Sequence, residues 1–321
     1  MFWNTSVKLI ISDVDETIAD NYLPANPEMI AELTSLLEEG KVLFMVTGAS
    51  IQRIKMRITD FLPAHLRKNV LAAHCSGAEV WGFTNDGELR DTPFYTLYEG
   101  AMTGEQKTKW RDLIQQLISE FKLKTHEPMG AVEFMKQTNS DPLAVILEDR
   151  GPQITFEFIN SYDMSVEQEK QLEVSVPQTH GNYDLRIPVL ARAQELFNTA
   201  GIPITPRLAG QWAIDFALQG VNKTTAVKTI LENEEILSEF GLTKADVNNP
   251  ENLEIWGDKF SAIRGGTDRH MCEAVSPEVR AIDFREENSE EFPKGFNIVL
   301  WDGNNHLHHG LQEYLQSRHN I

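Results

Sequence analysis

With 321 residues, of which 41% are hydrophobic and 24% charged, the chain is long enough for two folded domains and unlike a disordered protein. Its 48 acidic and 29 basic residues give a formal charge of -19, and a surface this negative repels nucleic-acid backbones and anionic membranes. We therefore expect neither nucleic acid nor a membrane as partner, and an anionic substrate needs help from a metal ion or from basic side chains in the site.

The first 85 residues alternate strand and helix signals, which indicates a parallel sheet covered by helices. A helix is expected to begin at Pro27 behind an Asn26 cap and to end at Gly40, and a second helix to begin behind a Ser50 cap. Buried strands are predicted for three short apolar runs, Val7–Ser12, Val42–Val46 and Val70–Ala73. This order is that of a βαβαβ unit.

From about residue 78 the pattern becomes that of an antiparallel sheet. The segments Glu79–Phe83 and Glu88–Thr92 flank Asn85-Asp86-Gly87, a turn sequence that favours a hairpin. Helices are expected over residues 110–121 and 190–197. Two further strand pairs are predicted, Leu143–Glu148 with Gln153–Ile159 and Ile202–Leu208 with Trp212–Leu218. Together these elements indicate an α+β unit inserted into the chain.

Helix and strand signals alternate again after Gly220. A helix is expected over Lys223–Leu231, strands over Leu253–Trp256 and Asn297–Leu300, and a last helix through residues 311–315, whereas the acidic run Glu286–Glu291 is expected to be a surface loop. We therefore predict an α/β protein with a Rossmann-like parallel-sheet core and an inserted α+β cap. The expected parts are residues 1–88 and 219–321 for the core and 89–218 for the cap.

The two cysteines, Cys75 and Cys272, belong to no zinc-binding pattern and are expected to be buried thiols. The first residues lack a basic leader and reach Asp13 too early for a signal peptide. No apolar run approaches the roughly 20 residues that a membrane-spanning helix needs. The expected compartment is the cytoplasm.

The segment Asp13-Val14-Asp15-Glu16-Thr17 directly follows the first predicted strand. Ligands of open α/β sheets bind beyond the carboxyl ends of the strands, where this segment lies. Two carboxylates two residues apart can serve one small site, with one attacking phosphorus while the other handles a proton. The pattern alone also fits a solvated turn or a helix cap.

Two further groups stand where a phosphate would bind. Thr47 and Gly48 directly follow the second predicted strand, so the hydroxyl and the neighbouring amides can bind a phosphate oxygen, although Thr47 alone also fits a helix cap. Lys223 opens a predicted helix, and a helix N-terminus favours an anion.

Carboxylates also follow the predicted strand Leu253–Trp256. Asp258 comes directly after it and Asp268 a little later, behind Gly265-Gly266. Because Mg²⁺ prefers hard oxygen ligands and keeps some of its waters, Asp13, Asp258 and a backbone carbonyl near Asp15 could share one ion.

In this order, Asp-x-Asp-x-Thr, Thr, Lys and Gly-Asp form the motif series of the haloacid dehalogenase superfamily, which the sequence resembles throughout its core. The insertion is similar to the α+β cap of subclass IIB. Within that subclass the chain looks most like the phosphomannomutase branch and its bacterial phosphatase-like relatives. The likeness rests on Gly257-Asp258-Lys259 with Gly265-Gly266 and Asp268, on Glu148–Phe156, and on Gly210-Gln211 followed by Asp215. Extra length lies near residues 100–110 and 232–252.

The resemblance implies a role for each motif residue. Asp13 would be the nucleophile that becomes aspartyl phosphate, and Asp15 the general acid and base. The phosphoryl group would be held by Thr47, Gly48 and Lys223, and Mg²⁺ by Asp13, Asp15, Asp258 and Asp268. In the cap, Arg150 and Asp215 match positions that contact the sugar phosphate, and the substrate is expected in a cleft between core and cap.

The departures from the family pattern point to hydrolysis. Glu16 stands where the branch usually has glycine and Thr267 replaces an asparagine, but neither change removes a catalytic group. Ser161 falls where phosphomannomutases carry a second phosphate-binding arginine, and Ala213 where they carry serine. We therefore predict a phosphatase acting on a small phosphate monoester, such as a sugar phosphate or a related metabolite.

Three other functions share parts of this pattern. A phosphomutase would be activated by an added bisphosphate. A catalytically idle protein that binds a phosphorylated metabolite fits less well, because Asp13, Asp15, Lys223 and Asp258 are all present. A nicotinamide-binding domain shares the alternating pattern, but no GxGxxG follows the first predicted strand. The sequence predicts no particular substrate and no oligomeric state.

Overall fold

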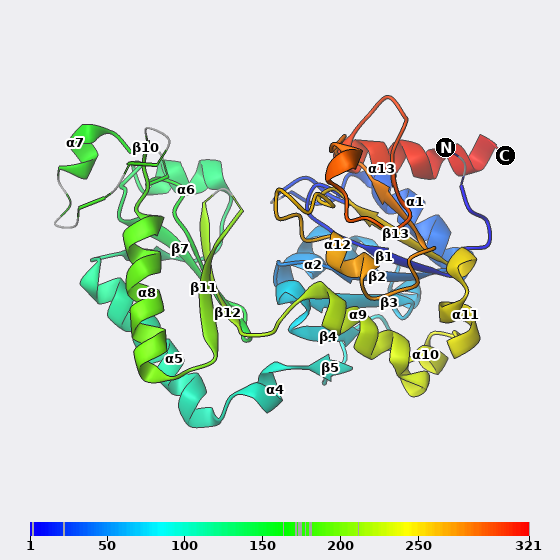
Figure 1. Ribbon diagram of the computed structural model, residues 1–321, viewed down its shortest axis with the longest axis horizontal. Coiled ribbons are helices and arrows are strands. Elements are labelled where there is room, and N and C mark those ends of the chain that lie inside the picture. Colours follow the sequence, from blue (N-terminus) through cyan, green and yellow to red (C-terminus); the bar gives the residue numbers. More distant parts are fainter. Residues whose placement is uncertain are drawn as a thin grey trace. The chain divides into compact units, whose positions relative to one another are not determined.

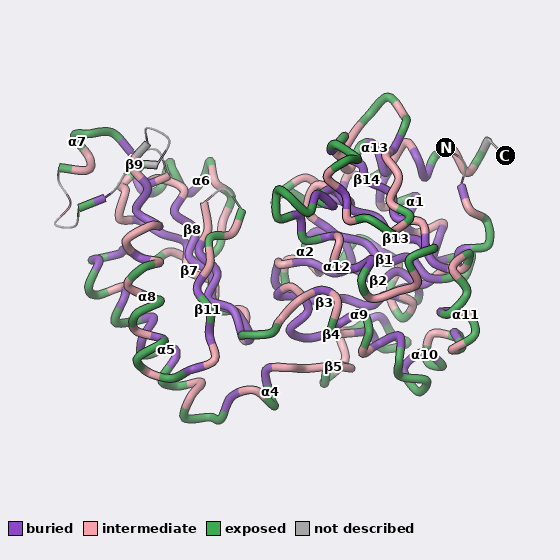
Figure 2. The backbone as a smooth tube through the Cα atoms, viewed as in Figure 1, coloured by how far each residue is buried: buried purple, intermediate pink, exposed green. Residues whose placement is uncertain are grey.

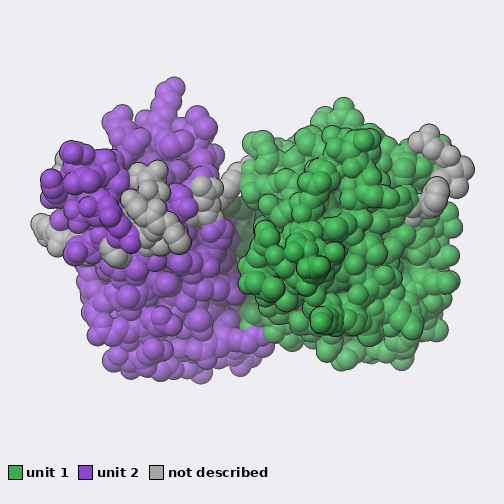
Figure 3. Space-filling view, turned by 45° about the horizontal axis from the view of Figure 1, so that its top comes forward, with its two compact units in different colours: residues 1–96, 221–321 green, residues 97–220 purple. Residues whose placement is uncertain are grey.

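The computed structural model describes the chain apart from Phe2, Tyr22, Asp163, Gln171, Glu173, Val174, Pro177, His180, Gly181, Gln211 and Ile321. The chain divides into two compact units, and the first of them is discontinuous in sequence (Figure 3). The first unit comprises Met1–Thr96 and Val221–Ile321, and the second comprises Leu97–Gly220. Each unit has its own sheet.

An eight-stranded sheet runs through the described part of the first unit, in the order β15-β14-β13-β1-β2-β3-β4-β5. Its strands from β13 through β1 to β5 are labelled in Figure 1. The parallel strands are β1 (Leu9–Ser12), β2 (Val42–Val46), β3 (Val70–His74), β13 (Leu253–Gly257), β14 (Arg280–Asp283) and β15 (Ile298–Leu300). Antiparallel strands β4 (Glu79–Gly82) and β5 (Tyr95–Thr96) complete one edge. Because β1 pairs with β2 on one side and with β13 on the other, the two ends of the chain build a single sheet.

Helices cover both faces of this sheet. Successive residues of β1 point to opposite sides, so Ile10 joins one apolar cluster while Leu9 and Ile11 join another. The first cluster includes side chains of α1 (Pro27–Glu38), α2 (Ile51–Arg57), α3 (Ala64–Arg67) and α13 (Leu307–Gln316). The second includes side chains of α9 (Lys223–Glu232), α10 (Glu234–Glu239), α11 (Lys244–Asn248) and α12 (Arg269–Cys272). The central strands are therefore buried along their length (Figure 2).

The second unit is an α+β unit. In its described part, a five-stranded sheet has the order β11 (Ile204–Ala209), β12 (Ala213–Leu218), β8 (Gln153–Glu157), β7 (Ala144–Asp149), β6 (Lys124–His126). Neighbouring strands are antiparallel except for β6 and β7. Its helices are α4 (Tyr98–Ala101), α5 (Gly104–Glu120), α6 (Ala131–Gln137), α7 (Val166–Glu169) and α8 (Arg186–Ala200). Phe197 of α8 packs edge-on against Phe216 of β12, with ring centroids 5.8 Å apart.

Short elements complete the chain. A small pair of strands, β9 (Gln178–Thr179) and β10 (Asn182–Tyr183), belongs to the second unit. Single 3₁₀ turns span Thr59–Phe61, Cys75–Gly77, Pro250–Asn252, Ser289–Glu291 and Ser317–Asn320. Cys75 and Cys272 are buried, as expected. Among the described helices, none combines the length and the apolar character that crossing a bilayer requires.

Among the expected elements, the hairpin predicted around Asn85-Asp86-Gly87 is the main one that the structure corrects. The turn forms, but Glu88–Thr92 makes no strand and contributes a single bridge between Phe83 and Leu89. Pro93 has no N–H with which to continue the ladder. Pairing resumes when Phe94 N donates to Val80 O at 2.8 Å, and β4 pairs with β5 instead. Residues 89–96, assigned to the cap from the sequence, therefore belong to the first unit.

Candidate active site

The expected carboxylates follow adjacent parallel strands of the first unit. Asp13 comes directly after β1 and Asp258 directly after β13. The two strands pair in parallel with Ser12 opposite Trp256, and the backbone N–H of Asp13 donates to Trp256 O at 3.0 Å. The register therefore brings Asp13 and Asp258 to the same edge of the sheet.

Lys223 joins two of the acidic residues. Its Nζ lies 2.6 Å from Asp13 Oδ1 and 2.7 Å from Asp268 Oδ1. The second oxygen of Asp268 accepts the backbone N–H groups of Asp258 and Lys259, each at 2.9 Å. Asp268 thus holds both the lysine at the start of α9 and the loop after β13. The structure brings together four residues predicted for the site, drawn from distant parts of the chain.

Three of these residues can hold a metal ion. Asp13, Asp258 and Asp268 each offer a carboxylate oxygen, and the three oxygens lie within 4.8 Å of one another. The side chains are buried, and a Cβ on Gly257 would lie only 2.7 Å from Asp268 Oδ2, so this glycine makes room for the group. Buried carboxylate oxygens are the donor set that Mg²⁺ prefers. In the described part of the chain the group does not include a carboxylate oxygen of Asp15.

The crowding of carboxylates changes their protonation. Burial raises the pKa of Asp13, against the pull of the Lys223 ammonium, and the Asp268 and Asp258 carboxylates raise it further. Burial and the nearby Asp268 also raise the pKa of Asp258 to about 6. Both raised pKa values mean that negative charge is unfavourable in this group of carboxylates. A bound cation would offset that charge.

Asp15 is bound by a residue that the sequence analysis missed. Arg57 Nη1 lies 2.5 Å from Asp15 Oδ1, and the Thr47 hydroxyl donates to Asp15 Oδ2 at 3.2 Å. Burial acts to raise the pKa of Asp15, but the Arg57 guanidinium brings it below its usual value. Arg57 is buried and also donates to the carbonyls of Asp20 and Leu23 at 2.6 and 2.9 Å. A charged residue three positions after Ile54, on the apolar face of α2, was the available signal.

Thr47 does not cap a helix. The cap of α2 is Ser50, whose hydroxyl accepts Arg53 N at 3.2 Å. Thr47 is fully buried, and its hydroxyl accepts Ala49 N at 3.1 Å while donating to Asp15. Gly48 stands beside Ser76, whose hydroxyl oxygen would lie 3.7 Å from a Cβ on the glycine. Thr47 therefore couples the loop after β2 to Asp15.

Glu16 occupies a backbone conformation that favours glycine. Its φ is 65°, in the left-handed region that glycine enters without strain and other residues seldom adopt. Its backbone N–H donates to Ala19 O at 2.8 Å, and its carboxylate accepts the amide of Asn21. These two bonds hold the loop that follows Asp13 and Asp15.

The two cap residues expected to contact substrate lie in the second unit. Arg150 donates to Glu148 Oε2 from Nε and Nη2 at 2.9 and 2.7 Å. Asp215 accepts the Thr155 hydroxyl at 2.9 Å, and Arg207 Nη2 lies 3.8 Å from its other oxygen. Gln211, part of the motif beside Asp215, is outside the described residues.

The acidic run Glu286–Glu291, expected to be a surface loop, contains one buried side chain. Glu287 is 7% exposed, and its Oε2 accepts the backbone N–H groups of Phe260 and Ser261, both at 2.7 Å. These amides belong to the loop that carries Asp258. The expectation was wrong for Glu287 because a run of like charges contains no local sign of a partner 26 or 27 residues away.

No family model matches the sequence, and no curated protein matches it. The fold is nevertheless similar to that of solved structures. One is a haloacid dehalogenase-like hydrolase from Bacteroides thetaiotaomicron, with a TM-score of 0.56 and 14% identity over 97% of this chain and 99% of that one. Another is a trehalose-6-phosphate phosphatase related protein, with a TM-score of 0.50 and 14% identity over 96% of each chain. The chain has the fold of the haloacid dehalogenase superfamily, with a parallel-sheet core and an inserted α+β unit.

Proposed function

We propose that this protein is a magnesium-dependent phosphatase that hydrolyses a small phosphate monoester through an aspartyl phosphate at Asp13. The observation that supports this most is the contact of Lys223 Nζ with Asp13 and Asp268, beside Asp258. A buried carboxylate next to a fixed ammonium and further oxygen ligands is suited to attack on a phosphate group.

Asp13, Asp258 and Asp268 would hold Mg²⁺, with a backbone carbonyl near Asp15 as a further ligand. When bound, Mg²⁺ offsets the charge of the carboxylates and of the substrate phosphate. An oxygen of Asp13 attacks phosphorus, and the bond from phosphorus to the leaving oxygen breaks. Lys223, fixed by its two carboxylate partners, places positive charge beside the transferring group.

Asp15 handles the protons. Its protonated form gives a proton to the leaving oxygen, and the resulting carboxylate then takes one from the water that attacks the aspartyl phosphate, so that inorganic phosphate leaves and both Asp13 and protonated Asp15 are restored. Arg57 and Thr47 hold the two oxygens of Asp15, which supports a fixed orientation during both steps. The Thr47 hydroxyl and the backbone amide of Gly48 would bind phosphate oxygens.

The second unit is proposed to be the cap that selects the substrate. Arg150 and Asp215 would contact the part of the substrate beyond its reacting phosphate. Both carry polar groups that suit hydroxyl or phosphate partners. One protein of similar fold is described as related to trehalose-6-phosphate phosphatase, which makes sugar phosphates the first compounds to test.

The test is a screen of the purified protein with Mg²⁺ against a panel of phosphorylated metabolites, scored by release of inorganic phosphate. We expect turnover of at least one small monoester, loss of that turnover with a chelator, and none for the Asp13→Asn variant. Release that persists in the chelated protein would contradict the metal assignment. Release that persists in the variant would contradict the nucleophile.

A further inference from the structure

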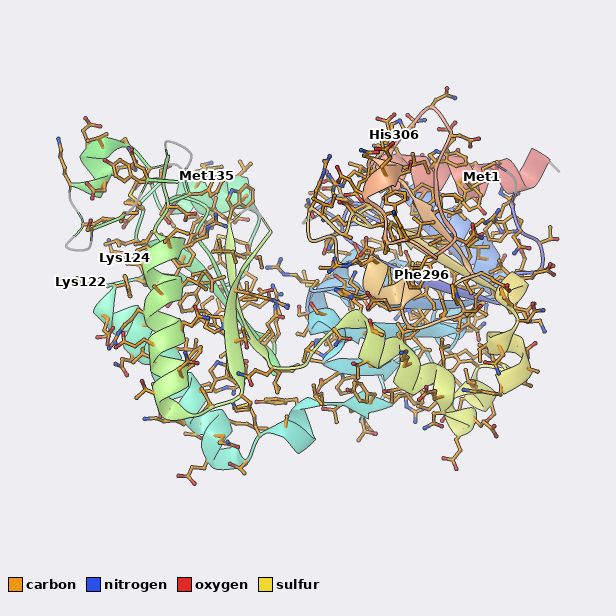
Figure 4. The ribbon with its side chains drawn as sticks, viewed as in Figure 1. Met1, Lys122, Lys124, Met135, Phe296 and His306 are labelled. Atoms are coloured by element: carbon orange, nitrogen blue, oxygen red, sulfur yellow. The ribbon has the colours of Figure 1, made fainter. Side chains whose placement is uncertain are left out.

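The loop of residues 284–287, here called the β14 loop, packs against the loop that carries Asp258. Phe284 N donates to Gly257 O at 3.0 Å, and Glu287 accepts the hydrogen bonds from Phe260 N and Ser261 N described above. On its other side, Leu307 N donates to Phe284 O at 2.6 Å. Near the start of α13, Nε2 of His306, labelled in Figure 4, lies 3.2 Å from Glu286 Oε1. The β14 loop is therefore held at several points.

This loop presents Arg285 to Asp258. Arg285 Nε and Nη2 donate to the same oxygen, Asp258 Oδ2, at 2.8 and 2.5 Å, and Nε also lies 3.1 Å from the Asp258 carbonyl. The other oxygen, Oδ1, accepts the hydroxyl of Thr17 at the long distance of 3.4 Å. Asp258 is therefore oriented through one oxygen while the other can still bind a ligand.

The positive charge of Arg285 also repels a cation bound at Asp258. A guanidinium stays protonated at any ordinary pH, so its repulsion of a nearby divalent ion is constant. Burial acts to lower the pKa of Arg285, but Asp258 raises it, and Glu16 and Glu287 add to the rise. At the acidic group formed by Asp13, Asp258 and Asp268, the positive charge next to a ligand lowers the attraction for a cation.

We propose that Arg285 sets the divalent-cation affinity of the acidic group, by orienting Asp258 through Oδ2 and by neutralising part of its charge. The proposal rests on the proposed function to the extent that this group binds a cation. Its consequence is weaker cation binding than three carboxylates alone would give. Arg285 is thus a positioning residue that acts through Asp258.

The test is calorimetric titration of the full chain with MgCl₂, without substrate, at fixed ionic strength. Arg285→Gln removes the charge and should bind Mg²⁺ about tenfold more tightly than the unchanged protein. Arg285→Lys keeps the charge and should bind with nearly unchanged affinity. Arg264→Gln is the matched control, because it removes the same charge from an exposed side chain that pairs with Glu291 at 2.8 Å. This control should leave the affinity unchanged.

Thermal unfolding of the same proteins, in chelator and in Mg²⁺, shows whether each variant is folded. In chelator, Arg285→Gln should unfold at a lower temperature than the unchanged protein, because Asp258 has lost its counter-ion. Addition of Mg²⁺ should raise the unfolding temperature of the variant by more than that of the unchanged protein. Equal or weaker Mg²⁺ binding by the folded Arg285→Gln variant overturns the role of Arg285 and leaves the proposed function standing. If the unchanged protein binds no Mg²⁺, the metal part of the proposed function falls together with this inference.

Discussion

Lys223 Nζ lies 2.6 Å from Oδ1 of Asp13, although 210 positions separate the two residues along the chain. Both side chains are buried, so their charges interact with little screening by solvent. Burial alone would lower the pKa of Lys223, but the carboxylates of Asp13 and Asp268 raise it, so the ammonium is held in its charged form. The ion pair links the start of α9 to the end of β1.

Asp13→Asn should abolish phosphate release while preserving the fold. The amide matches the carboxylate in shape and can still accept from Lys223, but it cannot attack phosphorus. Loss of a covalent nucleophile costs several orders of magnitude in rate. The measurement is phosphate release beside the circular dichroism spectrum. Substantial phosphate release from a variant with an unchanged spectrum would contradict the aspartyl-phosphate mechanism.

Lys223→Met should destabilise the protein in a pH-dependent way. The change leaves Asp13 and Asp268 buried without their counter-ion, which costs about 3 to 5 kcal/mol. The pKa of Asp13, already raised by burial, should rise further, so the folded state takes up a proton that the unfolded state does not. The loss of unfolding free energy relative to the unchanged protein should therefore grow above about pH 8, where Asp13 of the unchanged protein gives up its proton and Asp13 of the variant keeps it. Urea unfolding in chelator at about pH 7 and about pH 9 measures this, and an equal loss at both pH values would contradict it.

Arg57→Gln should alter the pH dependence of turnover. Arg57 keeps the pKa of Asp15 low against the effect of burial, so its loss should raise that pKa. The limb of the pH–rate profile that Asp15 controls should move to higher pH, and turnover should fall about ten- to a hundredfold because Asp15 loses its fixed orientation. Lys55→Gln, on the same helix, is the charge-matched control. An unmoved profile in Arg57→Gln would show that Asp15 does not control either limb.

Asp283→Asn should flatten the pH dependence of stability. Asp283 is fully buried, and no hydrogen-bond partner is found for its Oδ2 among the described residues. Burial raises its pKa from 3.8 to about 7 against the backbone N–H of Arg285, and Glu287 adds to the rise. The raised pKa means that wild-type stability is greatest with Asp283 protonated and decreases as the pH rises from about 4 to about 7.

The asparagine variant lacks this titration. At ~1.4 kcal/mol per pKa unit, it should gain a few kcal/mol relative to the wild type between about pH 5 and about pH 8. Urea unfolding at both pH values, in chelator, gives the comparison. Parallel pH profiles for the two proteins would show that Asp283 is ionised throughout this range.

Phosphate release should outrun interconversion of sugar 1- and 6-phosphates. Ser161 is buried and cannot replace a phosphate-binding arginine, and Arg150 is bound to Glu148. A charged hydrogen bond to phosphate contributes roughly 1.5 to 3 kcal/mol, so a bisphosphate intermediate should be retained about ten- to a hundredfold less well. Phosphorus NMR with a hexose bisphosphate present follows both routes. Rapid interconversion with little inorganic phosphate would favour a mutase.

Local chemistry made much of the fold predictable. The runs Leu9–Ser12 and Val42–Val46 are apolar on both faces, as buried parallel strands must be. Asn26 and Ser50 cap α1 and α2 as expected, because a side-chain oxygen that accepts a free amide is a property of a few adjacent residues. The β14 strand escaped prediction because its four residues include only two apolar ones.

Local patterns in the sequence were enough to place Asp13, Asp15, Lys223 and Asp258 relative to strand ends and helix starts. The contact of Arg57 with Asp15 across 42 positions, and that of Arg285 with Asp258 across 27, came to light only in the folded chain. Such pairs form because β1 packs beside β2 and β13, and because a buried charge without a counter-charge is too costly to keep. No periodicity along the chain encodes which arginine meets which carboxylate, because that choice is made by the packing of elements distant in sequence.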